Sequence, residues 1–253
     1  MKNRYFGDIY DYIKYALLRR LMDEDGCSAA VCWMLTEDDG GKDGHRTGYL
    51  GEPARWSSFE PTIFEFLRRH VVERETRNVG AVQRSKILPN CRFYSRILTD
   101  DRVQRQRYFD QFIGFARGVE LVFFDPDNGI EVKSARYGRR NSSKYLYWNE
   151  IERALRANHS LLIYQHLPPK PRGPLVRQVT KRLLQVSGGG IVYVFRTGKV
   201  AFFLMPRRGG VAQFKKGVSA VERTWNGVLT VSEHRLSTRK ATMTNRSMPP
   251  KVT

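Results

Sequence analysis

The 253-residue chain has few cysteines and no long apolar run. Its three cysteines, Cys27, Cys32 and Cys91, form no Cys-x-x-Cys pair, and no histidine cluster completes a zinc-ligand set. The first residues lack the apolar core of a signal peptide, and no segment approaches membrane-spanning length. These absences argue against a disulfide framework, a structural zinc site and a membrane protein. We therefore expect a cytoplasmic protein with reduced thiols.

Acidic residues are also scarce. The chain has 25 Asp and Glu against 44 Lys and Arg, which gives a formal net charge of +19. A surplus of this size says little about fold, but phosphate backbones bind basic surfaces and release counterions. Nucleic acid, either RNA or DNA, is therefore the expected partner. An acidic membrane surface ranks second, and no long basic amphipathic helix supports it.

Apolar residues make up 41% of the chain, enough for the core of one large α/β domain. Short apolar runs alternate with segments of helical spacing, which indicates a mostly parallel, Rossmann-like sheet with helices on both faces. The last two strands form a hairpin. The predicted strands are 29–35, 78–82, 92–98, 120–124, 160–165, 191–195 and 199–204, and the predicted helices are 8–22, 58–72, 101–117, 148–158 and 173–186.

The composition changes at Pro206. From there on basic residues far outnumber acidic ones, and the sequence after His234 has almost no apolar pattern. Such composition is typical of a solvated tail that binds acidic partners. We therefore predict an α/β domain over residues 1–205 and a basic, partly flexible C-terminal extension over residues 206–253.

The segment 119–131 reads VELVFFDPDNGIE and is the most informative in the chain. Its apolar run is typical of a buried parallel strand, and the Asp-Pro and Asn-Gly pairs that follow favour a tight turn. In open α/β sheets, ligands bind just past the carboxyl ends of the strands. His166 follows the next buried strand and should face the same rim with an imidazole that titrates near neutrality. The candidate catalytic residues are Asp125, Asp127, Asn128 and His166.

The same segment supports other interpretations. Asp125, Asp127 and Glu131 offer oxygens to Mg²⁺ or Mn²⁺, so a metal-dependent nuclease or phosphohydrolase is an alternative. Glu131-Val132-Lys133 is similar to half of a nuclease motif, but it stands too close to Asp127 for the usual pattern. The Asp-Pro and Asn-Gly pairs can also serve only as turn formers.

Three further features belong to the candidate site. An acidic, glycine-rich loop follows the first predicted strand over residues 36–48 and suits a cofactor, a cation, a phosphate or plain solvent. The N-terminal leader mixes aromatic and basic side chains, which stack bases and hold phosphates or pack in a core. A basic loop over residues 132–144 follows the DPDN turn. Its charged side chains either bind substrate phosphates or are simply solvated.

The strand layout, which ends in a reversed hairpin, resembles that of class I methyltransferases that use S-adenosylmethionine. The FFDPDN segment is similar to the (Asp/Asn/Ser)-Pro-Pro-(Tyr/Phe) motif of amino-methyltransferases, with Asp127 and Asn128 at its last two positions. Within this class the chain resembles the family that methylates adenine N6 in large-subunit ribosomal RNA. The similar segments are Arg4-Tyr5-Phe6-Gly7-Asp8, Asp11 with Lys14, Thr36 to Tyr49, and Tyr164 to Pro168 with the basic helix after it.

The resemblance implies a base methyltransferase in which Asp125 accepts hydrogen bonds from an exocyclic amine. It implies S-adenosylmethionine as cofactor and a nucleic acid as substrate. A metal-dependent hydrolase and a non-catalytic nucleic-acid-binding protein remain as alternatives. The implied cofactor-binding residues are Lys14, Thr36, Asp38, Asp39, Gly40 and Gly41, and the implied substrate-binding residues are Arg4, Tyr5, Arg139, Arg140 and Lys144.

Overall fold

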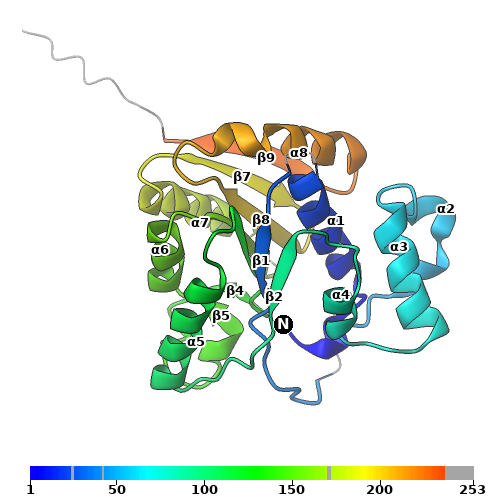
Figure 1. The fold of residues 1–253 in the computed structure, drawn as a ribbon, viewed down its shortest axis with the longest axis horizontal. Coiled ribbons are helices and arrows are strands. Elements are labelled where there is room, and N and C mark those ends of the chain that lie inside the picture. Colours follow the sequence, from blue (N-terminus) through cyan, green and yellow to red (C-terminus); the bar gives the residue numbers. More distant parts are fainter. Residues whose placement is uncertain (24–25, 42, 170–171, 237–253) are drawn as a thin grey trace, which may run out of the picture.

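The computed structural model describes residues 1–23, 26–41, 43–169 and 172–236, and its centre is a seven-stranded sheet (Figure 1). The strands lie side by side in the order β2-β1-β3-β6-β8-β7-β9. They are β1 (Ala29–Cys32), β2 (Cys91–Tyr94), β3 (Leu121–Phe124), β6 (Ser160–His166), β7 (Ile191–Arg196), β8 (Val200–Met205) and β9 (Thr230–Arg235).

The sheet is mixed, so the prediction of a mostly parallel sheet is wrong. Strands β2, β1, β3 and β6 pair in parallel, whereas β6–β8, β7–β8 and β7–β9 pair antiparallel. The predicted hairpin, which the structure confirms, accounts for the β7–β8 pairing, whereas β6–β8 and β7–β9 join strands that are not neighbours in the chain. Strand β8 returns from β7 through a tight turn, and strands joined by such a turn must run antiparallel.

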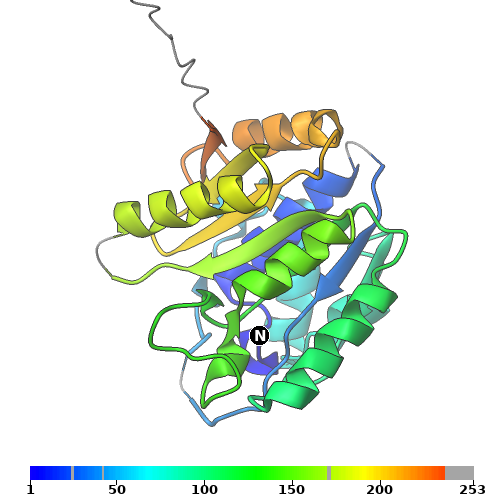
Figure 2. The same ribbon diagram turned by 90° about the vertical axis from the view of Figure 1, so that its left-hand side faces the viewer.

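Helices cover both faces of the sheet (Figures 1 and 2). They enclose two apolar cores, one on each face. Alternate strand residues point to opposite faces, so Leu121 and Phe123 enter one core while Val122 and Phe124 enter the other. This two-sided burial explains the continuous apolar run of β3. One face carries α1 (Ile9–Asp23), α3 (Pro61–Arg68), α4 (Gly80–Arg84) and α8 (Val211–Thr224), and the other carries α5 (Arg102–Phe115), α6 (Trp148–Arg156) and α7 (Arg172–Val186).

Shorter elements complete the chain. They are α2 (Pro53–Trp56), the paired strands β4 (Gly129–Ile130) and β5 (Tyr145–Leu146), and the single turns Asn3–Tyr5, Gly48–Gly51, Arg69–Glu73 and Ser142–Lys144. Within the described ranges, no helix combines the length and the apolarity needed to cross a bilayer.

The predicted strand at residues 78–82 is wrong, because this segment contributes to helix α4. The Asn78 side chain accepts a hydrogen bond from the backbone N–H of Gly80 at 2.7 Å, which turns the chain into the helix. A short apolar run fits a helix or a strand equally well, so local pattern could not decide.

The seventh strand is β9 instead, from the part of the sequence that we assigned to the C-terminal extension. Residues 211–235 form α8 and β9, with α8 packed on α1 and β9 paired with β7. Helix α8 approaches α1 very closely, since a Cβ added to Gly217 would lie 2.9 Å from the backbone oxygen of Arg20. From residue 237 on, the expected flexible tail lies outside the described residues.

A buried ion pair fixes the loop between β4 and β5. Arg105 of α5 is fully buried and donates from Nε to Glu150 Oε1 of α6 at 2.7 Å. It also donates to the backbone oxygens of Ser142 at 2.9 Å and Tyr145 at 2.6 Å. Its guanidinium lies 4.7 Å from the ring centroid of Tyr147. One side chain thus ties both helices to the loop that follows the DPDN turn.

Replacing Arg105 by Met should destabilise the protein by about 3–5 kcal/mol, because it leaves the buried Glu150 carboxylate without its cation. Urea unfolding monitored by circular dichroism measures this loss. Arg107→Met on the exposed side of the same helix is the matched control and should change the unfolding free energy by less than about 0.5 kcal/mol. Equal losses in the two variants would contradict the assigned role.

Candidate functional site

A pocket of about 470 Å³ opens at the carboxyl ends of β3 and β6, beside the end of β1. From β1 the chain crosses to β2 on one side, and it then returns to β3 on the other side of β1. Such a topological switch point is where open α/β sheets bind ligands. The lining comes from the N-terminal leader and α1, the loop at residues 43–46, the segment 125–128, and Tyr164 and His166 of β6.

Lys14 of α1 lies at the back of this pocket and holds two carboxylates. Its Nζ donates to Asp11 Oδ1 and to Asp125 Oδ2, each at 2.7 Å. The hydroxyl of Tyr15 donates to the other oxygen of Asp11 at 3.0 Å. Asp11 and Lys14 share a face of α1 because they stand three residues apart. The side chains of all four residues are buried, so this network connects α1 directly to the end of β3.

Burial and charge oppose each other in this network. Burial raises the pKa of the Asp125 carboxyl, while the positive charges of Lys14 and of the N-terminal ammonium act in the opposite direction. Burial alone would lower the pKa of Lys14, but Asp11 and Asp125 outweigh it and raise that pKa. Lys14 is therefore an ammonium at neutral pH, held by two acidic side chains.

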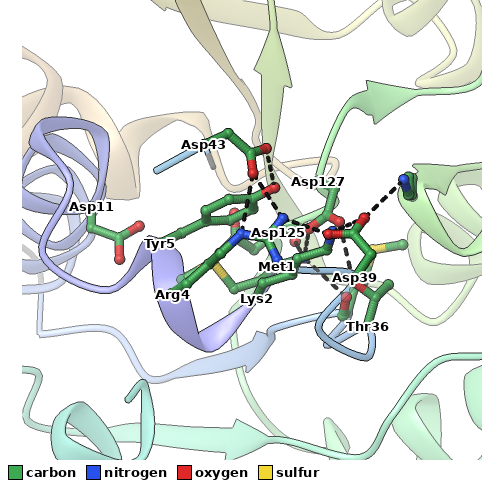
Figure 3. Close-up of polar contacts among 12 residues, drawn as sticks. Met1, Lys2, Arg4, Tyr5, Asp11, Thr36, Asp39, Asp43, Asp125 and Asp127 are labelled. Carbon is green, nitrogen blue, oxygen red and sulfur yellow. Dashed lines mark hydrogen bonds and ion pairs between the residues drawn. The ribbon is translucent and has the colours of Figure 1, made fainter. Parts of the chain in front are cut away.

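Asp127 binds a second cation (Figure 3). The N-terminal ammonium of Met1 forms an ion pair with Asp127 and donates to the backbone oxygens of Met34 at 3.1 Å and Asp125 at 3.3 Å. The hydroxyl of Thr36 donates to Asp127 Oδ2 at 3.1 Å. The two predicted catalytic carboxylates thus lie side by side, and each holds a positive group of the protein.

Gln165 shapes the turn after Asp127, a role that the sequence did not reveal. Its Oε1 accepts from the N–H of Ile130 at 2.9 Å, and its Nε2 donates to the backbone oxygen of Asn128 at 3.0 Å. Gly129 has a φ of +110°, and any Cβ there would collide with the Gln165 side chain. The available signal was a polar residue near the end of an otherwise apolar strand.

His166 lies on the wall of the pocket, as its position after the buried run of β6 predicts. Partial withdrawal from water lowers the pKa of its imidazole, and the positive charges of Arg46, Lys199 and Arg172 lower it further. On the same wall, Arg46 donates to the hydroxyl of Tyr10 at 2.7 Å, a pair that sequence reasoning did not single out. His166 is therefore a neutral imidazole at pH 7.

The predicted cofactor loop and the predicted substrate residues bind each other. Arg4 contacts Asp39 at 2.6 Å and Asp43 at 2.7 Å and also pairs with Asp38. The hydroxyl of Tyr5 donates to Asp43 at 2.6 Å. Lys2 and Lys144 both form ion pairs with Asp39. Within the loop, the N–H of Gly40 donates to Asp38 and the N–H of Gly41 donates to Asp39.

Three predicted site residues lie elsewhere. Glu131 accepts from the N–H of Trp148 at 3.1 Å, so it caps α6 instead of facing Asp125 and Asp127. Arg139 and Arg140 are exposed and are not part of the pocket wall. Over the part of the chain that the structure describes, no group of three or more His, Cys, Asp or Glu side chains is arranged to hold a metal ion.

Comparisons with known proteins place the chain in no family. No family model matches the sequence, and no curated protein matches it. A search of solved structures finds protein LPL1258 from Legionella pneumophila str. Philadelphia 1, described by the family model DUF519. The two chains share 10% identity and a TM-score of 0.43, over 92% of this chain and 98% of the other.

Replacing Lys14 by Met should destabilise the protein by about 3 kcal/mol or more, because two buried carboxylates then lose their shared cation. Chemical denaturation measures the effect. Lys181→Met, an exposed position on α7, removes the same charge without this contact and should change stability by less than about 0.5 kcal/mol. A loss in Lys14→Met no larger than in the control would show that the network contributes nothing.

The lowered pKa of His166 predicts a pH-dependent stability. The unfolded chain binds the imidazole proton more tightly than the folded protein, so this contribution is present above about pH 6.5 and is lost as pH falls. The unfolding free energy of wild type minus that of His166→Gln should therefore decrease between about pH 8 and pH 5. A difference that stays constant or rises toward acid pH would contradict the environment described for His166.

Proposed function

We propose that the protein is a nucleic-acid base methyltransferase of the class I type, with transfer to an exocyclic amine. The observation that carries the proposal is the position of Asp125 and Pro126, which follow β3 and line the pocket at the topological switch point. The reversed hairpin β7–β8 adds support, because the layout that the sequence resembles ends in one.

Asp125 has the properties of an acceptor for the amine. A base amine that attacks a methyl group becomes more acidic and must lose a proton. The Asp125 carboxylate and the Pro126 carbonyl would accept hydrogen bonds from the N–H groups. The carboxylate would take the proton as the bond from nitrogen to the methyl carbon forms and the methyl–sulfur bond of the donor breaks, with the thioether as leaving group. A pKa raised by burial brings Asp125 closer to the working pH, as general base catalysis requires. Lys14 fixes one carboxylate oxygen and leaves the other for the substrate.

The groups around Met1 suit the methionyl part of S-adenosylmethionine. In the structure an α-ammonium is bound by the Asp127 carboxylate and two backbone oxygens. The cofactor carries an α-ammonium of the same chemistry, so Asp127 and the backbone oxygens of Met34 and Asp125 would hold it once Met1 withdraws. When bound, S-adenosylmethionine supplies an activated methyl group. Asp38 and Asp39 are less suited, because both are engaged by Arg4.

The pocket has room for a base that has left its stack. Its volume of about 470 Å³ falls within the usual range for ligand sites. Tyr10, Tyr164 and His166 supply ring surfaces on its wall, and enzymes that modify bases read a flipped nucleotide by stacking and by hydrogen bonds. These rings compensate for Asn128, which stands where the related motif has an aromatic residue.

A metal-dependent hydrolase has less support. Glu131 caps α6 instead of facing Asp125 and Asp127, and among the described residues no three His, Cys, Asp or Glu side chains are arranged to hold a metal ion. We therefore do not propose hydrolysis as a second function.

The test is transfer of tritiated methyl groups from S-adenosylmethionine to ribosomal RNA, transfer RNA and DNA. Asp125→Asn preserves side-chain volume and an acceptor for Lys14, and it should lower the rate by about a hundredfold or more. Asp110→Asn on the exposed face of α5 is the matched control and should keep full activity. Thermal unfolding verifies that both variants fold. Absence of transfer by wild type to all three nucleic acids would contradict the proposal.

A further inference from the structure

Beside the pocket lies an open groove of about 630 Å³ with basic residues along it. Lys2, Arg4 and Lys144 line this groove, and Tyr5, Asp127 and Asn128 belong to the walls of both cavities. A chain that follows the groove therefore leads into the pocket beside Asp125. Basic groups spaced along a groove are how proteins track a nucleic-acid backbone.

The basic groups are covered by carboxylates. Asp38, Asp39 and Asp43, here called the acidic strap, contact Lys2, Arg4 and Lys144. Figure 3 shows Asp39 and Asp43 beside Lys2 and Arg4. The strap lies on the outside, since the side chains of Asp38 and Asp43 are 61% and 63% exposed. The cations lie beneath it, since those of Lys2 and Arg4 are only 3% and 11% exposed.

We propose that the acidic strap occupies the positions of substrate phosphates, and that a single-stranded nucleic acid must displace it to reach Asp125. This inference rests on the nucleic-acid part of the proposed function. The carboxylate of each pair is exposed, so water screens its charge and weakens its hold on the cation. A polyanion that replaces several such pairs at once also gains from counterion release. Ligands with little negative charge therefore do not displace the strap carboxylates, whereas a nucleic acid replaces them at the three cations.

The conformation of the loop that carries the strap is compatible with replacement of its carboxylates by phosphates. Gly40 and Gly44 have φ values of +70° and +81°, which glycine adopts without strain. Asp38 and Asp39 accept hydrogen bonds from N–H groups two residues further on, so local turns contribute to the shape of the strap. The three strap residues are exposed and belong to neither apolar core.

The experiment measures binding of a fluorescein-labelled oligouridine by anisotropy as a function of salt. The strap variant is Asp38→Asn, Asp39→Asn and Asp43→Asn together, which frees the three cations. The control is Asp110→Asn, Glu152→Gln and Glu222→Gln on α5, α6 and α8, which adds the same charge far from the groove. The strap variant should bind about tenfold more tightly than the control, with a salt slope steeper by about two.

Adding Arg4→Gln and Lys144→Gln to the strap variant should remove the gain. Equal affinities of the strap variant and the control for oligouridine would refute the proposal that the strap blocks the groove. A gain in affinity for phosphatidylserine vesicles, with none for oligouridine, would refute nucleic acid as the partner. Absence of oligouridine binding by every variant would overturn both this inference and the nucleic-acid part of the proposed function. A gain without methyl transfer would support the strap while the enzymatic proposal fails.

Discussion

The structure depends on one buried cation. Lys14 lies between Asp11 and Asp125, and three charges are withdrawn from water at this point. Isolated buried charges are strongly unfavourable, so the three groups are stable there only together and only in good geometry. The network therefore sets the position of α1 against the end of β3. It also sets the direction in which the Asp125 carboxylate faces the pocket.

The rest of the fold holds this cation in place. Helix α1 is covered by α8, and Gly217 permits a contact so close that a Cβ would meet the α1 backbone. On the other face, Arg105 ties the loop after the DPDN turn to α5 and α6. Helix α8 packs on α1 and is followed by β9, which pairs with β7 at the antiparallel edge of the sheet. Residues 211–235 therefore support a site that lies at the parallel half of the sheet. Residues far apart in sequence thus act on one carboxylate.

Local patterns predicted the elements with strong signals. The apolar run before Asp125 correctly predicted β3 and the turn after it. The turn residues after β7 correctly predicted the β7–β8 hairpin. The strand prediction for residues 78–82 failed because a short apolar run has no distinct period. Strand β9 was missed because four of its six residues are exposed and none is buried, so it carries little apolar pattern. The sheet direction followed from pairings that depend on tertiary contacts, which no local window contains.

The candidate site was also predicted only in part, because local patterns locate strand ends but not contacts between distant residues. Strand ends placed Asp125, Asp127 and His166 on one rim, as the topology of such sheets requires. The pairing of Arg4 with Asp39 joins residues 35 positions apart, and neither residue alone indicates it. Gln165 and Arg46 act through backbone and ring contacts that composition does not encode. Glu131 carries a carboxylate that could bind a metal ion, but in the fold this carboxylate accepts a hydrogen bond from the first turn of α6.

The most direct measurement is a crystal structure of the protein with S-adenosylhomocysteine and adenosine monophosphate. We expect the base in the pocket, its amine within hydrogen-bond distance of Asp125 and the Pro126 carbonyl, and the Lys14–Asp125 contact intact. We expect the homocysteine ammonium on Asp127 in place of Met1. A divalent cation bridging Asp125 and Asp127, or both ligands bound away from the carboxyl end of β3, would contradict the proposed methyl transfer.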